Sequence, residues 1–159
     1  MFQRALFAAS VLAFAGLGVA VAAEAITVEL KDFKLKSTSE DFKDGVALNE
    51  GDAKIGFYTE GTAVATVKIA EDGEYDIVIE ASCDEAEKMK AKMTVKIGDE
   101  VVKENFELKV VEAKEYTFTT KLKKGETKLS IAFTNDAFEE GKFDRNLYVH
   151  KVKIEKSKK

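Results

Sequence analysis

The chain has 159 residues, a formal net charge of −4 at pH 7 and a single cysteine, Cys83. This acidic balance argues against a nucleic-acid-binding protein, which needs a clustered basic face. One cysteine cannot form a disulfide within the chain, and we expect Cys83 to be a buried, inert thiol.

The first 23 residues have the features of an export signal. Arg4 supplies a positive charge, residues 5–19 form an almost continuous apolar run, and Ala20-Val21-Ala22 resembles a cleavage signal. The run is shorter and richer in alanine than the roughly 20 strongly apolar residues that a membrane span needs. A retained N-terminal anchor is the alternative. We expect cleavage after Ala22 or Ala23, no stable membrane insertion afterwards, and an exported protein that is periplasmic, cell-surface or secreted.

The rest of the chain predicts an all-β fold in one domain, residues 24–155, followed by a basic tail at 156–159. Short segments of alternating apolar and polar residues recur at regular spacing with polar turns between them. This pattern is typical of an antiparallel, jelly-roll-like β-sandwich. The expected strands are residues 26–30, 63–69, 75–81, 93–97, 101–102, 106–111, 116–122, 128–133 and 148–154.

Two stretches do not fit the strand pattern. Residues 37–52 are polar and poorly periodic, and we expect an irregular surface loop that Phe42 pins to the core. Residues 84–92 (DEAEKMKAK) have helix-forming composition and, taken alone, predict a helix.

The most informative stretch is residues 133–147, FTNDAFEEGKFDRNL. It brings Asp136, Glu139, Glu140 and Asp144 together between two apolar runs, so it predicts an acidic loop that the core holds at both ends. Ca²⁺ takes about six to eight oxygen ligands in flexible geometry, and a bound cation relieves repulsion among carboxylates. On composition alone, a solvated surface loop is the alternative.

The same stretch resembles the calcium-dependent, xylan-binding type of carbohydrate-binding module. The matching residues are the F-x-N-D segment at 133–136 and D-R-N-L-Y-V at 144–149. The similarity covers residues 63–154 well and residues 26–62 loosely. In that family the region corresponding to 84–92 is a loop, so we expect a single helical turn at most.

The resemblance implies a calcium ion held chiefly by Asp136 and Asp144, with Asn135 and Asn146 as further ligands. Adjacent hydroxyls of a sugar would bind the ion directly, as neutral, hard donors that replace water. Arg145 would pair with a loop acid, as a structural ion pair, or donate to the sugar.

Sugar sites usually also offer an aromatic face, and the chain contains no tryptophan. Phe138, Phe143 and Tyr58 are the candidates for ligand contact, although a core role for Phe143 fits equally well. Glu60, in the loop that follows Tyr58, would complete the metal shell if that loop lies at the same edge of the sandwich.

Related modules hold a second, structural calcium with an acid early in the chain and another acid after the last strand begins. Glu29 matches the first position, but His150 stands at the second. This departure argues against a second calcium in this chain.

The sequence argues against an enzyme. The chain has one histidine and no G-x-S-x-G elbow or phosphate-binding loop, and a glycosidase would need two carboxylates facing across a cleft. We expect a free-standing, exported, non-catalytic protein that binds a xylan-like polysaccharide or glycan through Ca²⁺. The alternatives are a structural or adhesive envelope protein that uses calcium for stability or partner docking, and a glycan hydrolase that depends on Asp136.

Overall fold

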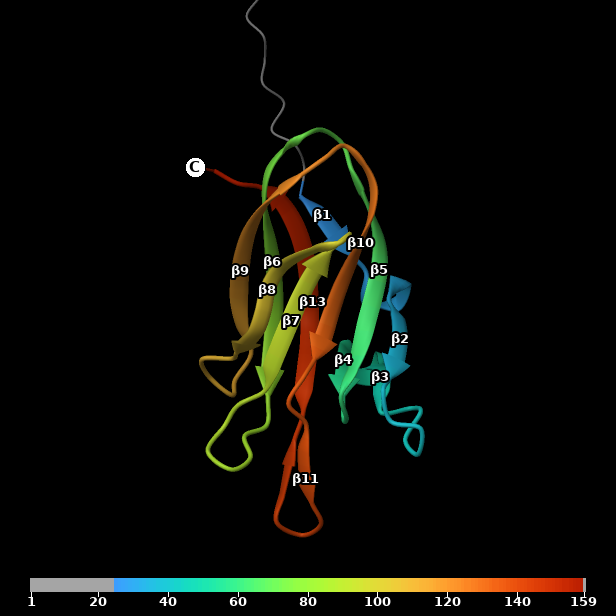
Figure 1. Cartoon of the computed structure of the whole chain (residues 1–159), viewed down its shortest axis with the longest axis vertical. Coiled ribbons are helices and arrows are strands. Elements are labelled where there is room, and N and C mark those ends of the chain that lie inside the picture. The colour runs from blue at the N-terminus through green and yellow to red at the C-terminus, as the bar shows by residue number, and fades with distance from the viewer. Residues whose placement is uncertain (1–24, 159) are drawn as a thin grey trace, which may run out of the picture.

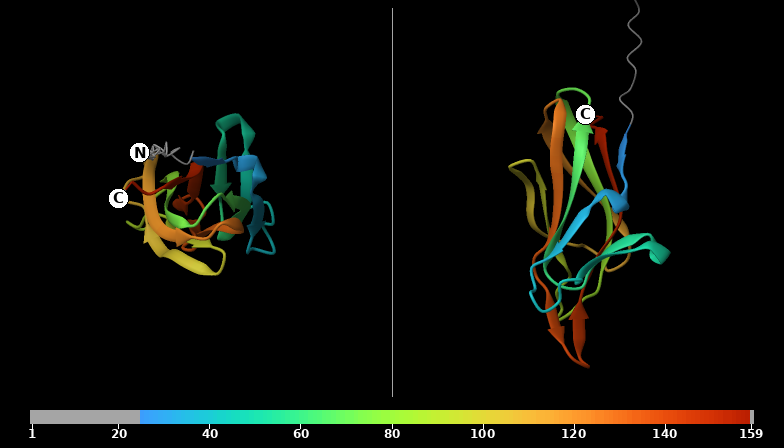
Figure 2. Two further views of the ribbon diagram at one scale, coloured as in Figure 1. Left: turned by 90° about the horizontal axis from the view of Figure 1, so that it is seen from above. Right: turned by 90° about the vertical axis from the view of Figure 1, so that its right-hand side faces the viewer.

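The computed structural model describes residues 25–158, which form two antiparallel β-sheets packed face to face. Figures 1 and 2 show the two layers, with a small hairpin extending from the end opposite the C-terminus. The predicted all-β sandwich is therefore confirmed. The predicted leader, residues 1–23, lies outside the described residues.

The first sheet has the strand order β3-β4-β13-β6-β9, and β1 also pairs with β13. The second sheet has the order β2-β5-β10-β7-β8, and β11 pairs with β12 as a separate hairpin. The strands of the first sheet are β1 (Ile26–Val28), β3 (Val46–Asn49), β4 (Lys54–Phe57), β6 (Gly73–Cys83), β9 (Lys114–Leu122) and β13 (Leu147–Lys156). Those of the second sheet are β2 (Lys34–Ser37), β5 (Gly61–Ile69), β7 (Lys92–Ile97), β8 (Glu100–Glu107) and β10 (Gly125–Phe133), and the hairpin consists of β11 (Ala137–Glu139) and β12 (Phe143–Arg145). Two short 3₁₀ turns, η1 (Leu30–Asp32) and η2 (Glu50–Asp52), complete the elements.

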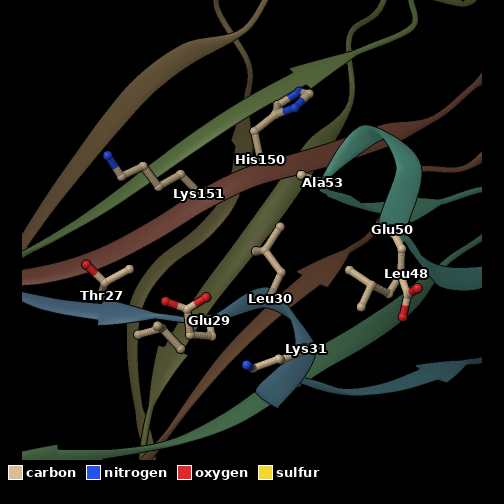
Figure 3. A pocket seen from close by; sticks show the side chains of 10 residues that line it. Thr27, Glu29, Leu30, Lys31, Leu48, Glu50, Ala53, His150 and Lys151 are labelled. Atoms are coloured by element: carbon tan, nitrogen blue, oxygen red, sulfur yellow. The ribbon is translucent and has the colours of Figure 1, made fainter.

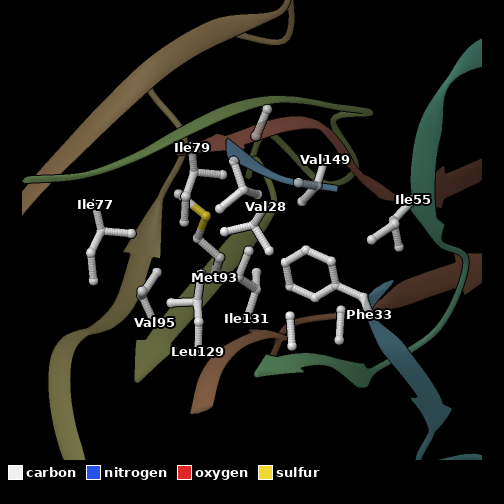
Figure 4. Close-up of a cluster of buried hydrophobic side chains, with 14 of the residues drawn as sticks. Val28, Phe33, Ile55, Ile77, Ile79, Met93, Val95, Leu129, Ile131 and Val149 are labelled. Carbon is white, nitrogen blue, oxygen red and sulfur yellow. The ribbon is translucent and has the colours of Figure 1, made fainter. Parts of the chain in front are cut away.

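The core lies between the two sheets and follows the two-residue period of the strands. In β5 and β10 the odd-numbered residues face inward, and the even-numbered residues face solvent. Figure 4 shows isoleucines of β6 meeting Met93 and Val95 of β7 and Ile131 of β10 across the interface. Cys83 belongs to this core, as predicted, and burial raises the pKa of its thiol.

Three expectations about individual segments were wrong. Residues 106–111 do not continue as a strand, because β8 ends at Glu107 and the Leu108 amide bonds instead to the Ala91 carbonyl. Residues 37–52 contain a strand, β3, and the turn η2. Phe42 is 48% exposed, so it does not pin its loop to the core.

Residues 84–92 form no helix. The Met89 amide donates to the Ala86 carbonyl at 2.9 Å, and the φ angles of Glu87 and Lys88 are +53° and +62°. Positive φ at both central residues is the geometry of a type I′ turn, which suits a tight connection between extended segments. The expectation of at most one helical turn is consistent with this result.

No helix within residues 25–158 is long and apolar enough to cross a bilayer.

A core substitution tests the packing. Phe57 is fully buried on β4, where it pairs with Val46 of β3 and Leu147 of β13. We expect Phe57→Ala to lower the free energy of unfolding by about 3–5 kcal/mol, because it leaves a cavity that the two sheets cannot close. Phe138→Ala makes the same chemical change at a side chain that is 66% exposed and should cost less than about 0.5 kcal/mol. Equal losses in a urea denaturation experiment would contradict this assignment of the core.

Candidate functional site

The acidic segment folds as a β-hairpin rather than as the expected loop. β11 pairs with β12 in the register Ala137 opposite Arg145 and Phe138 opposite Asp144. The turn is closed by the Lys142 amide, which donates to the Glu139 carbonyl at 3.0 Å, and Gly141 has a φ of +72°. The strands that flank the segment, β10 and β13, are present as predicted.

The register sorts the side chains of the hairpin into two faces. Phe138 and Asp144 are directly opposed, so they lie on the same face. Asp136, just before β11, lines the same cavity as these two residues, and Asn146 follows directly after β12. Arg145 is on the other face, and Phe143, which alternates with Asp144, is there too. This is why the structure separates ligand candidates that are neighbours in the sequence.

A cavity of about 450 Å³ lies at the base of the hairpin. Three segments that are distant in the sequence converge on it: the hairpin, the connection after β4, and the loop between β2 and β3. Of the predicted site residues, the cavity brings together Asp136, Asp144, Phe138 and Tyr58. The other lining residues, which the sequence analysis did not select, are Ser39, Phe42 and Thr59.

The surroundings of Asp136 disfavour its charged form. Burial raises the pKa of its carboxyl group, and the carboxylates of Asp144 and Glu60 raise it further, while the Thr59 side chain and the Ala137 amide act in the opposite direction. Its Oδ1 atom is buried and accepts no hydrogen bond. A buried acceptor without a donor is costly, and a cation would satisfy it.

Asn146 presents a second buried acceptor of the same kind. The residue is 4% exposed, and its Nδ2 atom donates to a carboxylate oxygen of Asp84 at 3.0 Å. The Tyr148 hydroxyl donates to the same oxygen at 2.8 Å. This network fixes the amide so that Oδ1 points away from Asp84, and Oδ1 has no hydrogen-bond partner. Asp84 therefore orients Asn146, a role that the sequence did not reveal.

Arg145 and Asn135 hold the hairpin in place through hydrogen bonds to backbone groups. The Arg145 guanidinium is 3% exposed and donates to the carbonyls of Met89 at 3.0 Å, Asn135 at 2.7 Å and Ala86. The expected ion pair with a loop acid is not formed. Asn135 accepts from the Lys92 amide at 2.7 Å through Oδ1 and donates to the Lys90 carbonyl at 3.0 Å through Nδ2, so it has a structural role.

The donor set suits a hard cation that takes oxygen ligands. Within residues 25–158, no three carboxylate, imidazole or thiolate groups converge on one point. A metal at the hairpin would therefore rely on Asp136 and Asp144 together with neutral oxygens such as Asn146 Oδ1. Ca²⁺ accepts such mixed oxygen ligands, whereas zinc prefers histidine and cysteine. The two unsatisfied buried oxygens are the observation that makes calcium fit.

A second cavity, of about 420 Å³, lies where β1 and η1 approach η2 (Figure 3). Glu29 and Glu50 line it, but so do Lys31 and Lys151. His150 Nε2 lies 2.7 Å from Ser82 Oγ, and burial lowers the pKa of the imidazole. Two carboxylates beside two lysines form a poor calcium cage. His150, which stands where related modules have an acid, thus lies beside a set of side chains that does not fit a second calcium ion.

Comparisons with solved structures place the fold among carbohydrate-binding β-sandwiches. The chain is 16% identical to the CBM36-1 domain of a multidomain xylanase from the hindgut metagenome of Trinervitermes trinervoides, with a TM-score of 0.63 over 84% of this chain and 98% of that one. It is 10% identical to a CBM35 from Paenibacillus barcinonensis, with a TM-score of 0.59 over 84% and 99%.

Similar domains also occur within larger enzymes. The match to a GH26-CBM35 β-(1,4)-mannanase of Podospora anserina has 13% identity and a TM-score of 0.58 and covers 85% of this chain but 28% of that one. No protein with a curated description matches the chain.

The fold and the hairpin site define a β-sandwich carbohydrate-binding module. The family model described as "Ca-dependent carbohydrate-binding module xylan-binding", CBM60, matches residues 76–159. The chain belongs to this family, whose members are non-catalytic modules that bind xylan with calcium. The resemblance inferred from the F-x-N-D and D-R-N-L-Y-V segments is confirmed.

Substitution of Arg145 tests how the hairpin is anchored. We expect Arg145→Gln to lower the free energy of unfolding by about 2–4 kcal/mol, because it leaves buried backbone carbonyls without donors. Lys142→Gln removes one positive charge from the exposed hairpin turn and should change stability by less than about 0.5 kcal/mol. Thermal unfolding of both variants measures the difference, and an unchanged Arg145→Gln protein would show that the guanidinium is not an anchor.

Proposed function

We propose that this chain is an exported, non-catalytic protein that binds xylan through one Ca²⁺ at the base of the β11–β12 hairpin. Asp136 and Asp144 supply the charge that holds the ion, and Asn146 Oδ1 supplies a neutral ligand. The observation that carries this assignment is the pair of buried oxygens, Asp136 Oδ1 and Asn146 Oδ1, that have no hydrogen-bond partner. When bound, the ion offers free coordination positions to a pair of sugar hydroxyls.

The walls of the cavity supply the apolar contacts that a sugar ring needs. Phe138, from the hairpin, and Phe42, from the β2–β3 loop, are 66% and 48% exposed and line the same cavity as the two aspartates. Aromatic side chains that line a cavity together with a few polar groups are typical of ligand-binding sites. Phe42 thus takes the role that the sequence analysis offered to Phe143.

Tyr58 holds the third side of the cavity. Its hydroxyl accepts from the Asn49 amide at 2.7 Å, and its ring packs edge to face on Tyr148, with centroids 6.1 Å apart. A ring fixed at both ends is preorganised, so little conformational entropy is lost when a ligand binds. Glu60 is exposed beside this loop and contributes negative potential that attracts the cation.

Calorimetric titration is the direct test of the calcium site. We expect the protein to bind Ca²⁺ with a Kd of about 0.1–1 mM, as extracellular calcium modules do, and to bind xylo-oligosaccharides in calcium but not in EDTA. Asp136→Asn should weaken calcium binding about tenfold or more, because it removes one of two carboxylates. Glu140→Gln makes the same change in the exposed turn and should bind normally. Calcium binding without sugar binding would favour the structural or adhesive alternative.

The stability of the calcium-free protein gives an independent test. Asp136→Asn should be as stable as the wild type or more stable by about 1 kcal/mol in EDTA, because it removes a buried carboxylate that repels Asp144. In saturating calcium the order should reverse, since only the wild type gains the full binding free energy. Thermal unfolding in both conditions measures the crossover, and the same order in both would contradict calcium binding at this residue.

The aromatic walls are tested by separating sugar affinity from calcium affinity. We expect Phe42→Ala and Phe138→Ala each to weaken xylo-oligosaccharide binding about tenfold, because each removes a stacking surface. Calcium affinity should not change, since neither side chain carries an oxygen. Phe143→Ala serves as the control for the opposite face of the hairpin and should leave sugar affinity within about twofold.

A further inference from the structure

The solvent-facing side of the second sheet carries five exposed lysines. They are Lys34 and Lys36 of β2, Lys68 of β5, Lys128 of β10 and Lys96 of β7, and we refer to them as the lysine face. The four strands lie side by side in Figure 1. All five residues occupy even-numbered positions, which in β5, β7 and β10 alternate with buried odd-numbered positions and in β2 with the half-buried Leu35 and Ser37.

The strand register sets the spacing of these charges. Lys34 is opposite Val64, Val64 is opposite Ser130, and Ser130 is opposite Lys96, so one row across four strands has a lysine at each end. Three strand spacings separate these lysines by about 14 Å. The charges are therefore distributed over the sheet rather than gathered at one point.

Few acids neutralise this face. At outward positions of the four strands the acidic residue is Glu126, which is opposite Lys68. A further lysine, Lys92, is half-buried and opposite Glu107 of β8. Among residues 25–158, none of the five lysines of the face lies within ion-pair distance of a carboxylate.

Several lysines of the first sheet, in contrast, have acidic neighbours. Its lysines Lys121 and Lys151 are opposite Glu74 and Glu80 in the strand register. Lys153 lies within 4 Å of two glutamates. By the same measure, Lys68 is opposite Glu126, but the other four lysines of the lysine face are opposite uncharged residues of the neighbouring strands.

We propose that the lysine face is a second binding surface, which takes polysaccharide chains that carry carboxylate groups. The side chains between the lysines are small, chiefly Thr62, Thr66, Ser130 and Ala132, so the face is flat enough for an extended chain to lie across it. Their hydroxyls can bond to sugar hydroxyls while the lysines attract the carboxylates. This surface does not depend on the calcium site.

The spacing of the lysines favours a polysaccharide over other polyanions. Duplex DNA carries one charge per about 1.7 Å, far denser than this face, where the two lysines that share a strand, Lys34 and Lys36, stand about 7 Å apart. The outward positions hold no aromatic residue on which a nucleic-acid base could stack. Val64 is their largest apolar residue, and they hold no Trp, Phe or Leu of the kind that anchors a protein in a lipid interface. A sparsely carboxylated sugar polymer matches both the spacing and the polarity.

The test compares glucuronoxylan with the same polymer after its carboxylates have been reduced to alcohols, in EDTA so that calcium plays no part. We expect the wild-type chain to bind the carboxylated polymer, more weakly as salt increases, and to bind the reduced polymer at least tenfold less well. The triple variant Lys34→Gln, Lys96→Gln, Lys128→Gln should bind about tenfold more weakly, because three surface charge contacts are lost.

A matched triple variant on the other sheet, Lys114→Gln, Lys121→Gln, Lys151→Gln, has the same net charge and should bind like the wild type. Circular dichroism and thermal unfolding confirm that both variants are folded. Equal losses in the two variants, equal binding of the two polymers, or preferential binding of a DNA oligomer or of anionic vesicles would overturn the proposal. Any of these results would leave calcium-dependent xylan binding, measured separately in calcium with neutral xylo-oligosaccharides, unaffected.

Discussion

The geometry of the site depends on one buried cation, the guanidinium of Arg145, which donates to backbone carbonyls in two separate segments. Two of these carbonyls belong to the Ala86–Met89 turn, and the third belongs to Asn135, just before the hairpin. Burial of a charge is costly, and here carbonyl dipoles rather than a carboxylate compensate it. The hairpin is thereby fixed to the body of the sandwich from one side.

This anchor also determines where the other face of the hairpin points. Successive side chains of a strand project to opposite sides, so fixing Arg145 inward fixes Asp144 toward the cavity. Asn135 adds a second attachment through its two bonds to the start of β7. The residues proposed to bind the ligand and the residues that hold them in place are thus neighbours in the sequence but lie on opposite faces of the hairpin. A shift of one residue in register would exchange their roles.

Binding capacity and stability oppose each other at this site. Asp136 and Asn146 each bury an oxygen that no hydrogen bond satisfies, and the two aspartates repel each other. A sequence selected for stability alone would place donors there. Asp84 makes the arrangement more rigid by holding the Asn146 amide in one orientation. The calcium-free protein therefore carries a local free-energy cost that an ion bound at the proposed site would remove.

The sequence predicted the fold and the ligand class but not the directions of the side chains. Long strands such as β5 and β6 were recognisable because their alternation continues over many residues. The four-residue strands β2, β3 and β4 were missed, since so short a segment shows little periodicity. The hairpin was read as a loop because its acids dominated the pattern, although Gly141 marked its turn. The roles of Arg145 and Phe42 were misjudged for a different reason. Arg145 bonds to a turn more than about 50 residues away, and Phe42 reaches the cavity through the path of its loop, neither of which local sequence encodes.

The two surfaces of the molecule divide recognition by charge. A calcium ion held by the two aspartates, as proposed, would select neutral hydroxyl pairs, and nearby lysines would weaken its binding by repelling the cation. The lysines instead occupy the face of a sheet, while the hairpin extends from the end of the sandwich. Screening reduces interactions beyond about 8 Å at physiological salt, so the two sites can keep opposite potentials on one small domain. A single polysaccharide that carries both neutral and acidic sugars would then gain avidity by reaching both surfaces, to the extent that its length spans the distance between them.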